Sequence, residues 1–211
     1  MKSLFGENSL KTVLFDYYPI TPSKVVCIGR NYVEHIHELN NEIPASMVVF
    51  NKPNSAVSDT LQCITPDTRF EGEICFLIMD GAIAGIGFGL DLTKADLQNY
   101  LKSKGLPWER AKGFDHSAVL SYFIPLKCTL ESLRMTLHIN GSLVQEALYD
   151  LMIYKPLEML EEIKSFMSLE DGDIIMSGTP KGVNTYREND HFVGRIYSNE
   201  DLLLECSWCA E

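Results

Sequence analysis

Short apolar runs of strand length are spread along most of the chain, and they limit the available folds more than any other feature of the sequence. A doubly wound parallel sheet alternates each strand with a helix, whereas here many strand-like runs accompany few helical patterns. The sequence therefore predicts an α+β, mainly β, domain. The runs are Lys24–Ile28, Met47–Phe50, Ile74–Ile78, Met135–Ile139, Ile174–Met176, His191–Ile196 and Leu202–Cys206.

Two turn signals and three helical patterns separate these runs. Asn140-Gly141 predicts a two-residue hairpin turn, because both central positions of such a turn need positive φ, and Asp171-Gly172 marks a second turn. Thr93 is the expected N-cap of the middle helix. The last helix carries an apolar stripe formed by Leu157, Leu160, Ile163 and Phe166. The three predicted helices are Tyr32–Leu39, Lys94–Lys104 and Leu157–Phe166.

Charge narrows the range of partners. Lys and Arg number 18 against 29 Asp and Glu, which gives a net charge of −11. A field of this sign repels phosphate backbones, so we expect no nucleic-acid partner, and it tolerates a cation. No apolar run approaches the roughly 20 residues that span a bilayer, and the first residues lack the apolar core of a secretion signal. We therefore expect a cytoplasmic protein without a membrane partner.

Two acidic residues open the run that follows position 70. Glu71 and Glu73 project from one face, since side chains alternate along a strand, and adjacent carboxylates repel unless a cation lies between them. Asp91 ends a later apolar stretch. Three carboxylates, with the remaining positions left to water, are typical of a site for Mg²⁺ or Mn²⁺. On spacing alone, a solvated strand end with Asp91 as a turn residue is the favoured alternative.

A histidine and a glutamate form a second candidate pair. His35 and Glu38 are three residues apart, so one helical turn places them on the same face. A carboxylate that binds imidazole fixes its tautomer and raises its basicity, as activation of a water molecule requires. The alternative is an ordinary surface helix, on which His37 lies off the shared face.

Two further segments carry candidate binding groups. Lys112 follows a turn that contains Pro107 and Trp108, and it could offer a fixed cation to a carboxylate or an enolate. The loop at residues 177–183 could present N–H groups and the Thr179 hydroxyl to an anion. The alternatives are a surface lysine and a plain turn.

The order of these motifs along the chain resembles the fumarylacetoacetate hydrolase family. The resemblance covers residues 24–183, and its most specific blocks lie around Lys112 and Thr179. In order, the blocks read GRNYxxHxxE, ExE, DxT, GLPWxxAKxFD, NG and GDIIxxGTPxGV.

The resemblance implies a mixed β-sandwich roll of the fumarylacetoacetate hydrolase C-terminal domain type. Residues 1–211 would form a single catalytic domain, with an N-terminal extension over residues 1–22 and a mobile lid over residues 32–45, and two copies would form a homodimer. The implied metal ligands are Glu71, Glu73 and Asp91, for Mg²⁺ or else Mn²⁺ or Ca²⁺. The implied catalytic residues are His35, Glu38 and Lys112, and the implied substrate contacts are Arg30, Tyr32, Gln98 and Thr179.

Two departures from the family pattern affect these expectations. Ala95 stands where relatives commonly have an arginine, and Lys94 would have to shift by about 100° around the helix to replace it. The connection between Glu73 and Asp91 is also short, which suggests that a peripheral element is trimmed while the metal ligands are kept.

The resemblance implies an enzyme that acts on a small 2-oxo acid. The expected reaction is metal-dependent hydrolysis of a C–C bond in an acylpyruvate, releasing pyruvate through a metal-stabilised enolate, with His35 deprotonating the attacking water. The alternatives at the same site are an oxaloacetate decarboxylase, and an isomerase or hydratase of unsaturated 2-oxo diacids. A metal-binding homologue with weak catalysis is a further alternative.

Overall fold

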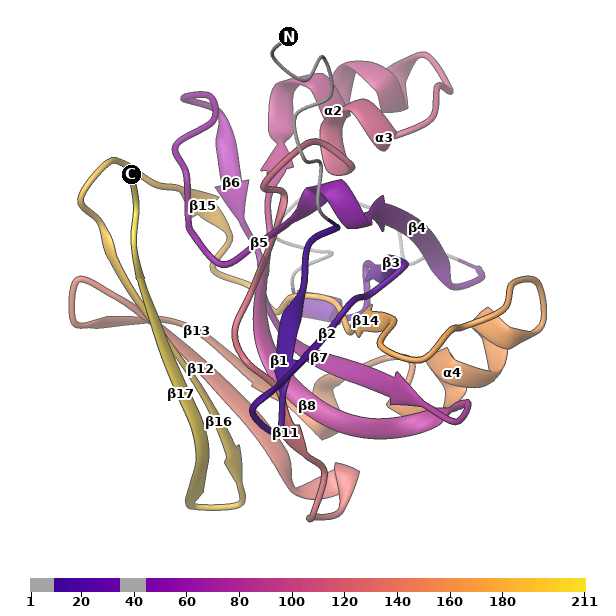
Figure 1. Ribbon diagram of the computed structural model, residues 1–211. Helices are drawn as coiled ribbons and strands as arrows, with labels where there is room; N and C mark the ends of the chain where they lie inside the picture. Colours follow the sequence, from indigo (N-terminus) through magenta and orange to yellow (C-terminus); the bar gives the residue numbers. More distant parts are fainter. Residues whose placement is uncertain (1–9, 35–44) are drawn as a thin grey trace, which may run out of the picture.

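Two β-sheets pack against each other, and short helices lie around them (Figure 1). The computed structural model describes residues 10–34 and 45–211. The α+β, mainly β, class is confirmed, and each predicted apolar run lies wholly or mostly within a strand. Among the described residues, no helix has the length and apolar character that crossing a membrane requires.

The larger sheet has the strand order β4-β3-β14-β7-β8-β10-β5, and β11 also pairs with β8. It is mixed, because β14 runs parallel to β3 and antiparallel to β7. Its strands are β3 (Lys24–Gly29), β4 (Val48–Pro53), β5 (Val57–Ser58), β7 (Gly72–Met79), β8 (Ala82–Asp91), β10 (Ala118–Leu120), β11 (Ile124–Pro125) and β14 (Ile174–Met176).

The second sheet is antiparallel, with the order β13-β12-β16-β17. Its first hairpin turns at Asn140 (φ +51°) and Gly141 (φ +82°), which confirms the predicted turn. Phe88 of the larger sheet and Trp208 of this sheet pack with ring centroids 6.2 Å apart, so the main core lies between the two sheets. The strands are β12 (Leu133–Ile139), β13 (Ser142–Leu148), β16 (His191–Ser198) and β17 (Asp201–Cys209).

Smaller elements cover the remaining surfaces. A three-stranded sheet has the order β15-β6-β9, and the hairpin β1–β2 packs on the second face of the larger sheet through Val13 and Phe15. These strands are β1 (Val13–Phe15), β2 (Tyr18–Ile20), β6 (Thr68–Phe70), β9 (Thr93–Lys94) and β15 (Asn184–Thr185). The 3₁₀ turns are η1 (Asn54–Ala56), η2 (Leu130–Ser132) and η3 (Tyr149–Leu151).

Strand β8 lies in a glycine-rich segment in which the sequence predicted no strand. Gly85, Gly87 and Gly89 alternate along it, so one face of the strand has no side chains between Gly85 and Gly89. A Cβ atom at Gly87 would meet the Phe123 ring at 2.8 Å, and one at Gly85 would meet the Phe15 ring at 2.7 Å. Glycine lowers strand propensity, yet at these positions close packing requires it.

Three helices whose bounds lie wholly within the described residues accompany the sheets: α2 (Ala95–Ser103), α3 (Glu109–Lys112) and α4 (Pro156–Lys164). Lys94, not Thr93, is the N-cap of α2, so that prediction was wrong. The predicted stripe on α4 was also partly wrong, because Leu157 and Phe166 are exposed. The buried face of α4 consists of Pro156, Met159, Leu160 and Ile163.

A buried carboxylate fixes the start of β3. The Asp173 side chain is fully buried and accepts hydrogen bonds from the N–H and hydroxyl of Ser23, the N–H of Lys24 and the N–H of Glu170, and it forms an ion pair with Lys24. Burial raises the pKa of Asp173, but these hydrogen bonds outweigh it and hold the pKa below its ordinary value. The ionised carboxylate therefore joins β3 to the loop that precedes β14.

We expect Asp173→Asn to lower the free energy of unfolding by about 2–4 kcal/mol at neutral pH, because buried donors lose a charged acceptor. A depressed native pKa stabilises the fold above the unfolded-state pKa, and this stabilisation is lost as the pH falls through the native pKa. Urea unfolding should therefore show a smaller difference in free energy of unfolding between the wild type and Asp173→Asn at about pH 3 than at about pH 7. Glu146→Gln, which breaks an exposed ion pair with Arg134, is the control and should lower the free energy of unfolding by less than about 1 kcal/mol. If the two variants lost the same free energy of unfolding, the stabilising role assigned to Asp173 would be wrong.

Candidate metal centre

The register of the β7–β8 hairpin brings the three predicted acids together. Gly72 pairs with Leu90, so Glu71 lies opposite Asp91, whose N–H donates to the Glu71 carbonyl at 2.9 Å. Directly paired residues share a face of a sheet, as do residues two apart on one strand. One oxygen from each of Glu71, Glu73 and Asp91 therefore lies within 4.8 Å of the others. The alternative of a solvated strand end is wrong, because Glu73 and Asp91 are only 2% and 1% exposed.

Glu73 is held by the loop that follows β14. Its Oε2 accepts a hydrogen bond from the N–H of Gly178 at 2.7 Å. Gly178 has φ +93°, a conformation that favours glycine. Burial, followed by the charges of Asp91 and Glu71, raises the pKa of Glu73 well above its ordinary value, although the Gly178 N–H opposes this shift. The predicted anion-binding loop thus directs this N–H group at a protein carboxylate.

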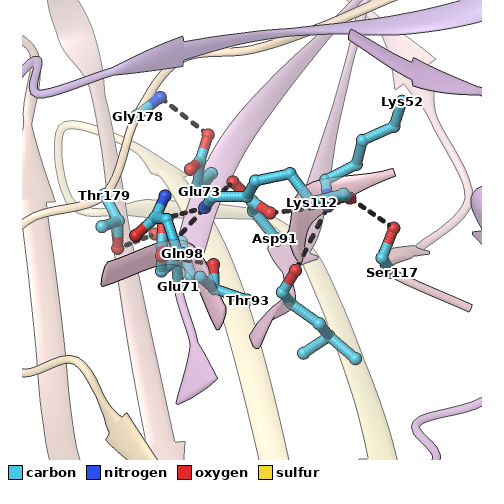
Figure 2. A network of polar contacts seen from close by, with 12 residues as sticks. Lys52, Glu71, Glu73, Asp91, Thr93, Gln98, Lys112, Ser117, Gly178 and Thr179 are labelled. Atoms are coloured by element: carbon cyan, nitrogen blue, oxygen red, sulfur yellow. Dashed lines mark hydrogen bonds and ion pairs between the residues drawn. The ribbon is translucent and has the colours of Figure 1, made fainter. Parts of the chain in front are cut away.

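Lys112 donates hydrogen bonds to two of the three acids, Glu71 and Asp91. It ends α3 and is 3% exposed, so the alternative of a surface lysine is wrong. Its Nζ donates to Asp91 Oδ2 at 2.7 Å and to the Glu71 oxygens at 3.0 and 3.1 Å, and Figure 2 shows its side chain reaching across to them. Burial lowers the pKa of Lys112, but the charges of Asp91 and Glu71 outweigh it, so the pKa lies above its ordinary value.

Sequence reasoning missed two donors that contact these acids. Lys52, on β4, is fully buried and forms an ion pair with Asp91 Oδ1 at 2.7 Å. Thr93 donates its hydroxyl to Glu71 Oε1 at 2.6 Å, so this residue binds a carboxylate instead of capping a helix. A lysine in an otherwise apolar strand was the available signal for the first, while nothing in the sequence distinguished the second from a cap.

Gln145 joins β7 to the loop that contains Thr179. Its Oε1 accepts the Gly72 N–H, and its Nε2 donates to the Thr179 hydroxyl, each at 2.9 Å. Thr179 in turn donates to the Gly72 carbonyl at 2.9 Å. The predicted substrate contact Thr179 is therefore buried, and its hydroxyl oxygen is already part of a protein network.

The other predicted substrate contacts lie around the cluster. Arg30 follows β3 with φ +57°, and Gln98, on α2, accepts a hydrogen bond from Lys102. Tyr32 is 2% exposed, and burial followed by the charge of Glu73 raises the pKa of its phenol. Within the described residues its hydroxyl has no hydrogen-bond partner. Tyr32 also lines a cavity of about 300 Å³ together with Met152, Pro180 and Lys181.

The remaining two predicted catalytic residues, His35 and Glu38, lie outside the described residues, as does most of the predicted lid. The described chain leads into that segment from Asn31, which is fully buried. The Asn31 amide donates to the Ser177 carbonyl at 2.7 Å, and its oxygen accepts the Tyr154 N–H at 2.7 Å. This anchor places the start of the segment next to the loop that binds Glu73.

The donor set suits a hard divalent ion. The three acids offer only carboxylate oxygens, which Mg²⁺, Mn²⁺ and Ca²⁺ prefer. Counted formally with Lys52 and Lys112, the cluster has a charge of 2 − 3 = −1. A divalent ion would relieve the repulsion that raises the pKa of Glu73 and would make the centre positive by one.

Comparison with known proteins gives consistent matches over most of the chain. A family model described as fumarylacetoacetate (FAA) hydrolase C-terminal matches residues 24–198. Oxaloacetate tautomerase YcgM of Escherichia coli is 34% identical over 206 residues, covering 89% of this chain and 93% of that protein. The mitochondrial oxaloacetate tautomerase FAHD1 of Bos taurus is 34% identical over 191 residues, covering 82% of this chain and 86% of that protein.

A solved structure gives the same picture of the fold. The crystal structure of fumarylpyruvate hydrolase from Pseudomonas aeruginosa, in complex with Mn²⁺ and pyruvate, superposes with a TM-score of 0.87. The two chains are 25% identical, and the match covers 98% of each.

We expect Glu73→Gln to weaken Mn²⁺ binding by at least about 100-fold, because the variant loses one of three charged ligands. Mutation of a residue that only hydrogen-bonds a metal ligand already lowers metal affinity by about 10- to 100-fold. Calorimetric titration of chelated, dialysed protein measures this loss. The amide still offers an oxygen to the Gly178 N–H, so the variant should fold.

The same variant should be more stable than the wild type without metal. A carboxyl whose native pKa is raised destabilises the fold as it ionises above its unfolded-state pKa, and Gln does not ionise. The stability advantage should therefore be larger at about pH 8 than at about pH 5. Glu200→Gln, at a side chain that is 96% exposed, is the control. An unchanged Mn²⁺ affinity in Glu73→Gln would contradict the prediction that Glu73 is a metal ligand.

Proposed function

We propose that this chain, which belongs to the fumarylacetoacetate hydrolase family, is a divalent-metal-dependent enzyme that acts on small 2-oxo acids at Glu71, Glu73 and Asp91. The observation that carries the proposal is the cluster of these three acids, in which Glu73 and Asp91 are buried and Glu71 is half-buried, with Lys112 bound against it. The names of the relatives support it, since oxaloacetate and fumarylpyruvate are both 2-oxo acids.

The charge of the centre matches such a substrate. With a divalent ion, the three acids and the two lysines carry a formal charge of +1, which attracts the carboxylate of a 2-oxo acid. A bound Mg²⁺ or Mn²⁺ supplies a Lewis acid for neighbouring carboxylate and keto oxygens. Because its pKa is raised, Lys112 stays charged at neutral pH and provides a cation where negative charge develops.

Tyr32 is the second group that we assign to substrate binding. Its buried hydroxyl has no partner among the described residues, and burial of an unpaired hydroxyl costs free energy. A substrate oxygen would satisfy this donor. The cavity beside Tyr32 then provides room for the part of the substrate that lies beyond the 2-oxo acid group.

Removal of electron density from the keto group favours enolisation at the neighbouring carbon, and several reactions share this step. Keto–enol exchange of oxaloacetate needs no further reactant, so oxaloacetate is the first substrate to test, in line with the relatives at 34% identity. Hydrolysis of an acylpyruvate also needs an activated water. We assign that role to His35, oriented by Glu38.

We expect chelated, dialysed protein to regain turnover of oxaloacetate when Mg²⁺ or Mn²⁺ is added. The assay follows the ultraviolet absorbance of the enol and, in parallel, the release of pyruvate from oxaloacetate and from an acylpyruvate. Turnover that is equal with and without divalent ions would contradict the proposal, as would no reaction with any of the substrates.

His35→Ala should reduce hydrolysis of the acylpyruvate by about 10²- to 10⁴-fold and leave keto–enol exchange of oxaloacetate largely intact, because only hydrolysis needs the activated water. His37→Ala removes a histidine two positions away and is the matched control. If His35→Ala lowers both activities equally, then His35 does not act as the water-activating base.

A further inference from the structure

Each of the three acids has one oxygen held by a donor from another part of the fold. These donors come from a strand, a loop and the segment that leads into α2. The pairs are Asp91 Oδ1 with Lys52 Nζ at 2.7 Å, Glu73 Oε2 with the Gly178 N–H at 2.7 Å, and Glu71 Oε1 with the Thr93 hydroxyl at 2.6 Å. The second oxygens of Asp91 and Glu71 accept hydrogen bonds from Lys112 Nζ at 2.7 and 3.1 Å, and a carboxylate oxygen has a further lone pair for a shared ligand.

Lys52 is the only one of these three donors that carries a charge, and its position is fully determined. An ammonium group has three N–H bonds. The Lys52 Nζ donates hydrogen bonds to the Leu92 carbonyl at 3.2 Å and to the Lys112 carbonyl, and it forms an ion pair with Asp91 Oδ1 at 2.7 Å. Its side chain is 0% exposed, so water does not compete for these contacts. One group thus fixes both the Asp91 carboxylate and the backbone that carries Lys112.

We propose that Lys52 is a positioning residue that keeps Asp91 a one-oxygen ligand and thereby makes this centre prefer Mg²⁺ or Mn²⁺ over Ca²⁺. The inference rests on the proposed metal-dependent function. Ca²⁺ accepts roughly six to eight oxygens and readily takes both oxygens of a carboxylate, whereas Mg²⁺ requires a compact octahedral arrangement. With Oδ1 against the buried Lys52 ammonium, Asp91 offers a divalent ion only Oδ2, which the ion would share with Lys112, and binding through one oxygen suits the smaller ions.

Charge alone does not produce this preference. A lysine near the centre repels every divalent ion by about the same amount, so its loss would change both affinities in the same direction. The ratio of the Ca²⁺ and Mg²⁺ dissociation constants cancels that common effect. This ratio therefore reports on the geometry of Asp91.

The test is a competition titration of chelated protein with Mg²⁺, Mn²⁺ and Ca²⁺ for the wild type and for Lys52→Met. We expect the wild type to prefer Mg²⁺ and Mn²⁺, and the variant to lose about tenfold or more of its preference over Ca²⁺. Lys52→Arg keeps a cation next to Asp91 and should restore most of the preference. A folded Lys52→Met protein with an unchanged ratio would overturn the proposal.

Lys24→Met is the matched control, because Lys24 on β3 also forms an ion pair with a buried aspartate, Asp173. This variant should lower stability without changing the ratio. Should it change the ratio as much as Lys52→Met does, a general loss of packing would explain the result and the proposal would be wrong.

An infrared measurement covers the case in which Lys52→Met does not fold. The splitting of the carboxylate stretches separates one-oxygen from two-oxygen binding, and the Mg²⁺-loaded wild type should have the one-oxygen splitting at Asp91, identified by comparison with Asp91→Asn. A two-oxygen signature would overturn the proposal. A wild type that binds none of the three ions would instead overturn the proposed function, so the two failures are distinguishable.

Discussion

The pairing register of the β7–β8 hairpin is the constraint on which the centre depends. Glu71 and Glu73 face the same side as Asp91 only because Gly72 pairs with Leu90. A slip by one residue would turn one strand over and separate Asp91 from the two glutamates. The register is secured by burial on both faces of β7, since Ile74 and Phe76 belong to the core between the sheets while Cys75 and Leu77 belong to the second core. The packing that stabilises the hairpin therefore also sets the positions of the acids.

This arrangement concentrates charge where water is scarce, and the surrounding residues compensate for it. Transfer of carboxylates from water into a protein interior costs several kcal/mol each unless partners replace the lost hydration. Lys112 and Lys52 provide two ammonium groups, and the Gly178 N–H and the Thr93 hydroxyl provide neutral donors. The raised pKa of Glu73 indicates that this compensation is incomplete in the chain alone. A divalent cation would complete it, so the same imbalance of charge favours binding of such an ion.

The sequence was sufficient to predict the class of fold and most of the strands, because apolar runs and the Asn140-Gly141 turn are local signals. The sequence grouped the three acids only through the family resemblance, since their spacing alone favoured a solvated strand end. It was insufficient for β8, whose alternating glycines match no strand propensity and make sense only against Phe15 and Phe123. Asp80-Gly81, with φ +50° and +70°, is a turn signal, but a hairpin that ran regularly from this turn would pair Glu71 with Leu90. The register shift between Leu77 and Ile78 moves Asp91 opposite Glu71, and no local pattern indicates that shift. The contacts of Lys52 and Thr93 depend on strands and loops distant in sequence, and no local pattern contains them.

The proposed centre and its rim are built differently, and this difference would allow one site to accept several 2-oxo acids. The ligand oxygens come from paired strands, and their outer donors are buried, so the position of a bound ion is the most rigid part of the site. Tyr32 comes from a loop and lines the cavity, and Gln98 comes from helix α2. Substitutions at the rim, such as Ala95 in place of the usual arginine, can therefore change which substrate fits without disturbing the acids. In the proposed function, the enolisation chemistry would follow from the hairpin, and the choice among reactions would follow from the segments that surround it.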